Sequence, residues 1–245
     1  MKRLQAFIVF LLFFTVLMAS VFLPPAVSQL KDRSLFGKIN TQFIDEKTVV
    51  SASSMNVEDK LILISSYNRD AENVIMVNQQ QNLGLQSGEQ DVALSAVKEL
   101  ENMREKGLFP DIPLDNGSKF LDYTLMTYTD ISKPGNSCRI WSLSFSFGSS
   151  GKNVCNVLMD AETHMIYQFY VWTDESLPVY DLKAVASKFV QYIGIQWDEK
   201  SPYTQSEMNL YSAGNGEILY QFFQAKDNQG FGIQMITNKK IIDKM

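Results

Sequence analysis

The sequence predicts an α+β protein: an N-terminal transmembrane helix followed by two tandem units, each with one helix packed on an antiparallel meander sheet. Three observations lead to this prediction. Residues 6–23 are almost wholly apolar. Two later segments carry apolar residues at helical spacing, and each is followed by segments in which apolar and polar residues alternate. This order of helix and strands occurs twice, in 85–175 and in 176–245.

The composition is that of a folded protein and excludes one class of partner. The chain has 245 residues, 45% of them hydrophobic, and a net charge of -5. Its length allows one large domain or two small ones. Proteins bind phosphate backbones through clustered Lys and Arg, and no basic run is longer than two residues, as at Lys239-Lys240. We therefore expect no nucleic-acid partner.

The N-terminus has the pattern of a membrane segment. Lys2 and Arg3 are followed by no charged residue until Lys31. The eighteen residues of 6–23 would form about 27 Å of helix, close to the hydrocarbon thickness of a bilayer. The two basic residues predict that the N-terminus stays in the cytoplasm and that the rest is extracytoplasmic. The predicted location is the cell membrane, with a single pass.

Two fates of this segment remain open. It is either an uncleaved anchor or a signal peptide cut after Ser28, where Ala26-Val27-Ser28 resembles a cleavage site. We favour the anchor, because the apolar stretch is longer than that of most signal peptides. Residues 1–28 are assigned to it, and residues 29–84 to a juxtamembrane linker with short strands at 60–65 and 73–78.

Each predicted unit opens with a helix that has recognisable ends. Ser87 and Gln90 form a capping box, and Gly107 ends the first helix. Asp181 caps the second helix, and Gly194 ends it. The strands are predicted at 119–129, 138–147, 153–160 and 165–172 in the first unit, and at 206–213, 217–225, 231–236 and 241–243 in the second.

Two cysteines could pair in an exported protein, but the strand pattern argues against it. Apolar and serine residues alternate through 141–147, and Cys155 continues the apolar face after a turn. Cys138 falls on the serine side. The two sulfur atoms would then lie on opposite faces of the sheet, so we expect two free thiols.

The polar residues between the strands 153–160 and 165–172 include the only histidine, His164. A nucleophile elbow of the form G-x-S-x-G is missing from the sequence, and one His with two separated Cys is a poor zinc ligand set. We therefore interpret Asp160 as the first residue of an Asx-turn at a solvated tip, and His164 as a solvated turn residue. No catalytic, cofactor-binding or metal-binding residue is predicted.

The hairpin Val157–Ile166 resembles a motif of the PepSY domain and its cystatin-like relatives, V-x-V-D-A-x-T-G-x-I. His164 stands where that family has glycine. The resemblance covers 85–172, and less clearly 178–245. It implies a PepSY/cystatin-like fold, and an exported, often membrane-tethered protein of Gram-positive bacteria. It also implies a non-enzymatic role, such as binding or inhibiting a peptidase or regulating an envelope partner.

Aromatic residues crowd two predicted strands and occupy both of their faces. One face must be core, and the other is either covered by the second unit or free to bind a partner. The candidate partner-binding residues are Tyr167, Phe169, Tyr170, Trp172, Tyr220, Phe222 and Phe223.

The sequence thus favours a membrane-anchored extracytoplasmic binding or regulatory protein without catalytic activity and without cofactors. It would act on another envelope protein or a peptide, and contact the membrane through 6–23. Two alternatives stay open: a secreted or surface hydrolase with a site of carboxylates and hydroxyls, or a structural component of the envelope or spore coat. The hydrolase would need a cavity with at least two convergent ionisable groups.

Overall fold

The computed structural model describes residues 55–69, 71–79, 87–112, 114, 119–148, 153–198 and 209–236, all within one compact unit, Val50–Met245. The described helices are α2 (Val57–Asn68), α3 (Ser87–Glu105) and α4 (Leu182–Ile193). The described strands are β1 (Val74–Gln79), β2 (Lys119–Asp130), β3 (Ser137–Phe147), β4 (Asn153–Asp160), β5 (Ile166–Trp172), β6 (Leu210–Ala213), β7 (Ile218–Gln224) and β8 (Gly230–Met235).

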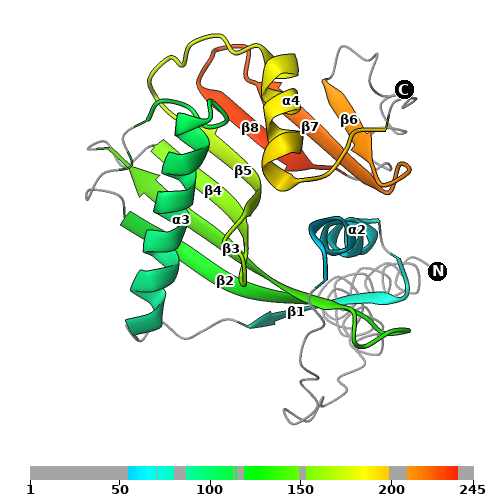
Figure 1. Cartoon of the computed structure of the whole chain (residues 1–245). Coiled ribbons are helices and arrows are strands. Elements are labelled where there is room, and N and C mark those ends of the chain that lie inside the picture. Colours follow the sequence, from blue (N-terminus) through cyan, green and yellow to red (C-terminus); the bar gives the residue numbers. More distant parts are fainter. Residues whose placement is uncertain are drawn as a thin grey trace, which may run out of the picture. The chain divides into compact units, whose positions relative to one another are not determined.

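The predicted α+β class is confirmed. The eight strands form one antiparallel sheet in the order β1-β2-β3-β4-β5-β8-β7-β6 (Figure 1). The first five strands follow one another as a meander, and the last three form a second meander in the reverse direction. The predicted strand at 241–243 lies outside the described residues.

The strands of the two predicted units meet where β5 pairs with β8. Phe169 lies opposite Ile233, and Trp172 lies opposite Gly230. The units therefore share one sheet and one main core. Their interpretation as copies of one PepSY-like unit stays a prediction.

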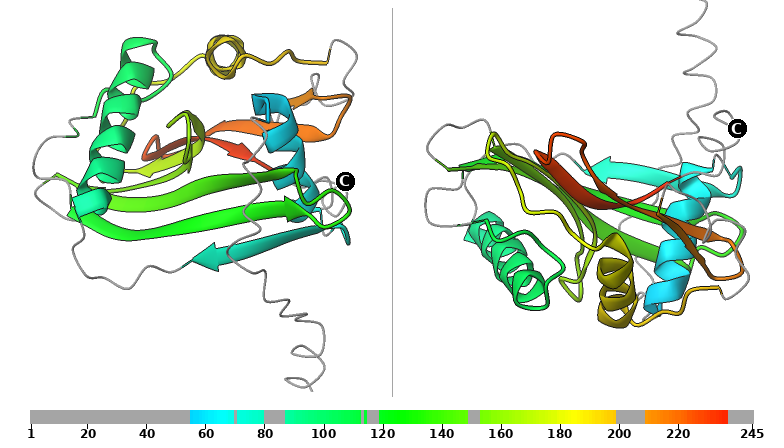
Figure 2. Two further views of the ribbon diagram at one scale, coloured as in Figure 1. Left: turned by 60° about the horizontal axis from the view of Figure 1, so that its bottom comes forward. Right: turned by 90° about the horizontal axis from the view of Figure 1, so that it is seen from above.

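The helices α3 and α4 lie along one face of the sheet (Figure 2). The ends of α4 agree with the predicted caps: the Asp181 carboxylate accepts from the Lys183 and Ala184 amides, and Gly194 ends the helix with a φ of 73°. Gly107, predicted to end α3, follows that helix with a φ of 68°, whereas the side chains of the predicted capping box, Ser87 and Gln90, lie outside those described. Phe189 of α4 packs edge-on against Tyr220 and Phe222 of β7. These two helices therefore bury the face of the sheet on which they lie, which we call the inner face.

The predicted strand at 60–65 is wrong, because these residues belong to α2. The run K-L-I-L-I-S has an apolar pattern that fits either a buried strand or a buried helix. The deciding signals are the Asn56 side chain, which caps the Asp59 amide at 2.8 Å, and the two acidic residues of the first turn. The prediction of a strand at 73–78 is confirmed by β1.

The prediction of free thiols is confirmed. The pairing of β3 with β4 shows that the two cysteines are far apart along the strands, which is a stronger reason than their expected positions on opposite faces of the sheet. Both cysteines are buried and unbridged. Cys155 lies opposite Phe145, and Cys138 lies seven residues from Phe145 along β3. At about 3.3 Å per residue this separation is roughly 23 Å, far beyond disulfide reach.

The predicted membrane segment, 6–23, and its alternative cleavage site lie outside the described residues. Within the part of the chain that is described, no helix has both the length and the apolar character needed to span a membrane.

Candidate functional site

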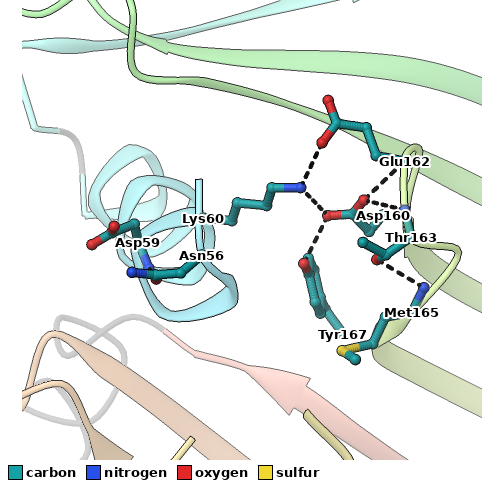
Figure 3. Close-up of polar contacts among 8 residues, drawn as sticks. All are labelled: Asn56, Asp59, Lys60, Asp160, Glu162, Thr163, Met165 and Tyr167. Atoms are coloured by element: carbon teal, nitrogen blue, oxygen red, sulfur yellow. Dashed lines mark hydrogen bonds and ion pairs between the residues drawn. The ribbon is translucent and has the colours of Figure 1, made fainter. Parts of the chain in front are cut away.

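A buried ion-pair cluster connects α2 to the turn between β4 and β5 (Figure 3). The Lys60 Nζ atom lies 2.9 Å from Asp160 Oδ2 and 2.9 Å from Glu162 Oε2. The side chains of Lys60 and Asp160 are 4% and 0% exposed, and that of Glu162 is 34% exposed. The Tyr167 hydroxyl also donates to Asp160 Oδ2, at 2.7 Å.

The second oxygen of the same carboxylate closes the turn. Asp160 Oδ1 accepts the amides of Glu162 and Thr163 at 2.8 and 2.9 Å, so the predicted Asx-turn is confirmed. His164 is exposed, and its φ of 60° is the left-handed conformation that glycine would adopt at this position. The prediction of His164 as a solvated turn residue is confirmed.

The expectation that Asp160 lies at a solvated tip is wrong. Its carboxylate is covered by Lys60 and by Tyr167. Lys60 precedes Asp160 by 100 residues, so no local pattern predicts that its ammonium group covers this carboxylate. A lysine inside an apolar run was the one signal in the sequence, because a buried ammonium needs a nearby carboxylate.

The cluster holds both partners in their charged forms. Burial disfavours the Asp160 carboxylate, but hydrogen bonds from Lys60, the Thr163 amide and Tyr167 outweigh it and lower the pKa of Asp160 below its usual value. Burial likewise opposes the Lys60 charge, and the bonds to Asp160 and Glu162 outweigh it, so the pKa of Lys60 is raised. Burial and the adjacent Asp160 charge raise the pKa of the Tyr167 hydroxyl.

These properties suit a structural connection better than an acid, base or nucleophile. A protonated amine is not a nucleophile, and the oxygens of Asp160 already accept four hydrogen bonds. Within the described ranges, no group of three His, Cys, Asp or Glu residues is placed to hold a metal ion.

A hollow of about 470 Å³ lies elsewhere, between the end of α2 and the start of β1. Its lining residues are Tyr67, Asn68, Ala71, Glu72 and Val74. Glu72 is the single carboxylate among them. The other ionisable group of the lining is the Tyr67 phenol, so these residues do not supply the pair of carboxylates that a glycosidase needs.

The candidate aromatic residues divide between the core and the outer face. Tyr167, Phe169, Tyr220 and Phe222 are 0–1% exposed and lie in the core, where a partner cannot reach them in this fold. They point inward because they alternate with outward residues along β5 and β7, and Tyr167 keeps this alternation although it is the extra residue at the bulge in the β4–β5 pairing.

The other three aromatic residues lie on the outer face of the sheet. Tyr170 and Phe223 stack with their ring centroids 5.7 Å apart, above Gly232 of the strand between them. A Cβ atom on Gly232 would approach Phe223 Cζ to 2.8 Å, and one on Gly230 would approach Trp172 Cε3 to 3.0 Å. The two glycines therefore let these rings lie against the backbone of β8. We call Tyr170, Trp172 and Phe223 the aromatic platform.

Loss of the Lys60 charge should destabilise the protein strongly. Lys60→Met leaves the Asp160 carboxylate buried without its cation, and we expect the free energy of unfolding at pH 7 to fall by about 3–5 kcal/mol. Urea denaturation measures the change. The control is Glu217→Gln, which breaks the exposed ion pair with Arg69 and should cost at most about 1 kcal/mol. Equal effects of the two substitutions would contradict the structural role of the cluster.

The cluster also predicts how stability depends on pH. The pKa of Asp160 is lowered by folding, so its contribution is present above the unfolded value of about 4 and is lost as the pH falls. The pKa of Lys60 is raised, so its contribution is lost as the pH rises above about 10.4. In Lys60→Met, the free energy of unfolding should therefore change less steeply with pH than in the wild type, both on the acidic side and on the alkaline side.

His164→Gly should be neutral or slightly stabilising, by up to about 1 kcal/mol, because glycine adopts a positive φ without strain. Thermal and urea denaturation of the variant measure the change. The comparison variant is His164→Val, which places a β-branched residue at this φ and should be destabilising. A loss of more than about 1 kcal/mol in His164→Gly would show that the imidazole has a role beyond the turn.

Comparisons with known proteins add no assignment to this geometry. No protein-family model matches the chain, and neither a curated protein nor a solved structure matches it significantly. The resemblance of Val157–Ile166 to the PepSY hairpin therefore stays a prediction.

Proposed function

We propose that this chain is a membrane-anchored, extracytoplasmic binding or regulatory protein that catalyses no reaction and acts on another envelope protein or peptidase. Residues 6–23 would hold it in the membrane, with the N-terminus in the cytoplasm. The sheet would then present its outer face to the partner. Two PepSY/cystatin-like units sharing one sheet would be the scaffold.

The observation that carries this proposal is the aromatic platform. Trp172 is 37% exposed, and the stacked rings of Tyr170 and Phe223 are half-buried. Protein interfaces are enriched in aromatic residues and depleted of charge at their centres. The strand residues beside the platform on the same face are uncharged: Asn156, Leu158, Gln168, Gln221 and Gln234. One charge lies at the margin, because burial and the Asp227 carboxylate of the β7–β8 turn raise the pKa of Tyr170.

The polar neighbours are already organised. The Gln234 amide donates to Gln221 Oε1 at 2.9 Å, and Gln168 Oε1 accepts the amide of Met235 at 3.1 Å. These contacts restrict the glutamine side chains before any partner arrives. A pre-ordered surface loses less conformational entropy on binding, which favours recognition by this face.

The hydrolase alternative is less well supported by the same geometry. Asp160, the most buried of the described carboxylates, is neutralised by Lys60, whereas a glycosidase acid needs a raised pKa in an enclosed cleft. The structural alternative, an envelope or spore-coat component, would require neither a specific partner nor the platform. Loss of partner capture on changing the platform separates it from the leading proposal.

Partner capture from membranes tests the proposal. We expect crosslinking and affinity purification of the full-length chain to recover a defined envelope protein, whose affinity falls about tenfold or more in Trp172→Ala. Leu94→Ala is the matched control, because Leu94 is 66% exposed on α3 and lies outside the platform. Equal capture by both variants would remove the platform from the interface.

N-terminal sequencing of the mature protein tests the anchor. We expect residues 6–23 to be retained and the protein to stay with membranes after a high-pH wash. A mature chain that begins at Gln29 would show cleavage after Ser28 and a secreted protein instead.

A further inference from the structure

We propose that the free edge of β1 is a self-association surface, at which two copies of this chain pair their β1 strands antiparallel and extend the sheet across a two-fold axis. This interface lies apart from the aromatic platform, and only its strength in a membrane rests on the anchor of the proposed function. The inference starts from a difference between the two edges of the sheet.

The edge at β6 is covered by the chain itself. Trp197 forms an isolated antiparallel bridge with Ala213, and the Asp198 amide donates to the Ser212 carbonyl at 2.8 Å. The Asp198 carboxylate also accepts the Ser212 hydroxyl and the Gly216 amide. Natural sheets protect their edges in such ways against pairing with another chain.

The edge at β1 has no comparable cover among the described residues. Its sequence is VIMVNQ, which contains no charge and no proline, and its pairing with β2 shows no bulge. Lysine, proline and bulges are the usual devices that block strand addition. This edge uses none of them.

The direction of the backbone groups follows from one hydrogen bond. The Ile131 amide donates to the Asn73 carbonyl at 2.8 Å, so Asn73 points toward β2. Because these directions alternate along an antiparallel strand, Ile75 and Val77 also bond to β2, and Met76 and Asn78 point away from it. The Val74 amide is taken by the Ala71 carbonyl, which limits any added strand at that end.

The side chains beside this edge are apolar and exposed. Ile75 is 38% exposed, Val77 is 44% exposed and Ile131 is 52% exposed. Ile75 lies opposite Thr129 and Val77 opposite Thr127, so all three apolar side chains belong to one face of the sheet. An apolar row next to an open strand edge is a site for strand addition.

The strand is complementary to itself in one register. If Met76 lies opposite Met76 of the second copy, its amide and carbonyl form two hydrogen bonds across the axis, and the Asn78 amide of each copy donates to the Val74 carbonyl of the other. Ile75 then faces Val77 of the second copy in both halves of the interface. No like charges meet, so the second copy fits better than a charged segment of another protein.

The pairing would be weak in solution, because two short strands bury much less than the roughly 1,200 Å² of a stable interface. Confinement of the chain to a membrane would raise its effective concentration and favour the pair. The test therefore uses the full-length chain in native membranes, and it reads the register rather than affinity alone.

Disulfide trapping reads this register directly, since both natural cysteines are buried. In the double variant Ile75→Cys with Val77→Cys, each new thiol faces the other one across the axis at a Cα separation of about 4.5 Å, within disulfide reach. We expect mild oxidation to give a crosslinked dimer as the main product. Leu94→Cys, at an exposed site on α3, should give about tenfold less dimer.

A second pair of variants separates backbone pairing from simple proximity. Asn78→Pro removes an outward amide without touching the bonds to β2, and should reduce trapping about tenfold when added to the double variant. Asn78→Ala keeps the amide and should leave trapping unchanged. Equal trapping at position 94, or trapping that is insensitive to Asn78→Pro, would overturn the proposal.

Three further outcomes decide which partner occupies the β1 edge and whether the two proposals stand separately. A disulfide to a different protein in place of the dimer would overturn the second copy as the occupant. If the dimer forms while Trp172→Ala still captures the envelope protein normally, the self-association holds and the proposed function fails at its platform. If no dimer forms and Trp172→Ala loses capture of the envelope protein, the platform proposal holds and the β1 interface is overturned.

Discussion

The buried pair of Lys60 and Asp160 is the constraint on which the rest of the structure depends. Two charges taken from water require close geometry and further hydrogen bonds, and both are present. The pair fixes α2 against the β4–β5 turn, while the Ser65 hydroxyl of the same helix donates to the Glu217 carbonyl at the β6–β7 turn. A single helix therefore fastens two turns that lie in different meanders, and the sheet cannot separate between β5 and β8 without breaking those contacts.

Most of the fold could be predicted from the sequence where the relevant signals are local. Alternation of apolar and polar residues marked β2 to β5 to within one residue at each end. The ends of α4 followed from Asp181 and Gly194, and the left-handed turn at His164 followed from a hairpin pattern. In each of these cases the physical cause lies within a few residues of its effect.

The features that could not be predicted depend on contacts between distant parts of the chain. Nothing near Lys60 shows that its partner is Asp160, so the sequence predicts a solvated carboxylate where the structure has a buried one. The pairing of β5 with β8 and the division of the aromatic residues between core and surface are similar cases. Periodicity shows that two faces exist, but which face is covered depends on where α3 and α4 lie. The wrong strand at 60–65 is a different case, because the Asn56 cap and the acidic first turn of α2 are local signals.

That division makes surface function separable from stability. Phe169 and Trp172 lie on the same strand, yet Phe169 is fully buried and Trp172 is more than one-third exposed above a glycine. Truncating Phe169 would leave a cavity in the core, at a cost of about 3–5 kcal/mol. Truncating Trp172 removes a ring that rests on the outside of β8 and leaves the ion-pair cluster and the inner face in place. A loss of binding in that variant can therefore be assigned to the surface itself, provided that the unfolding transition is retained.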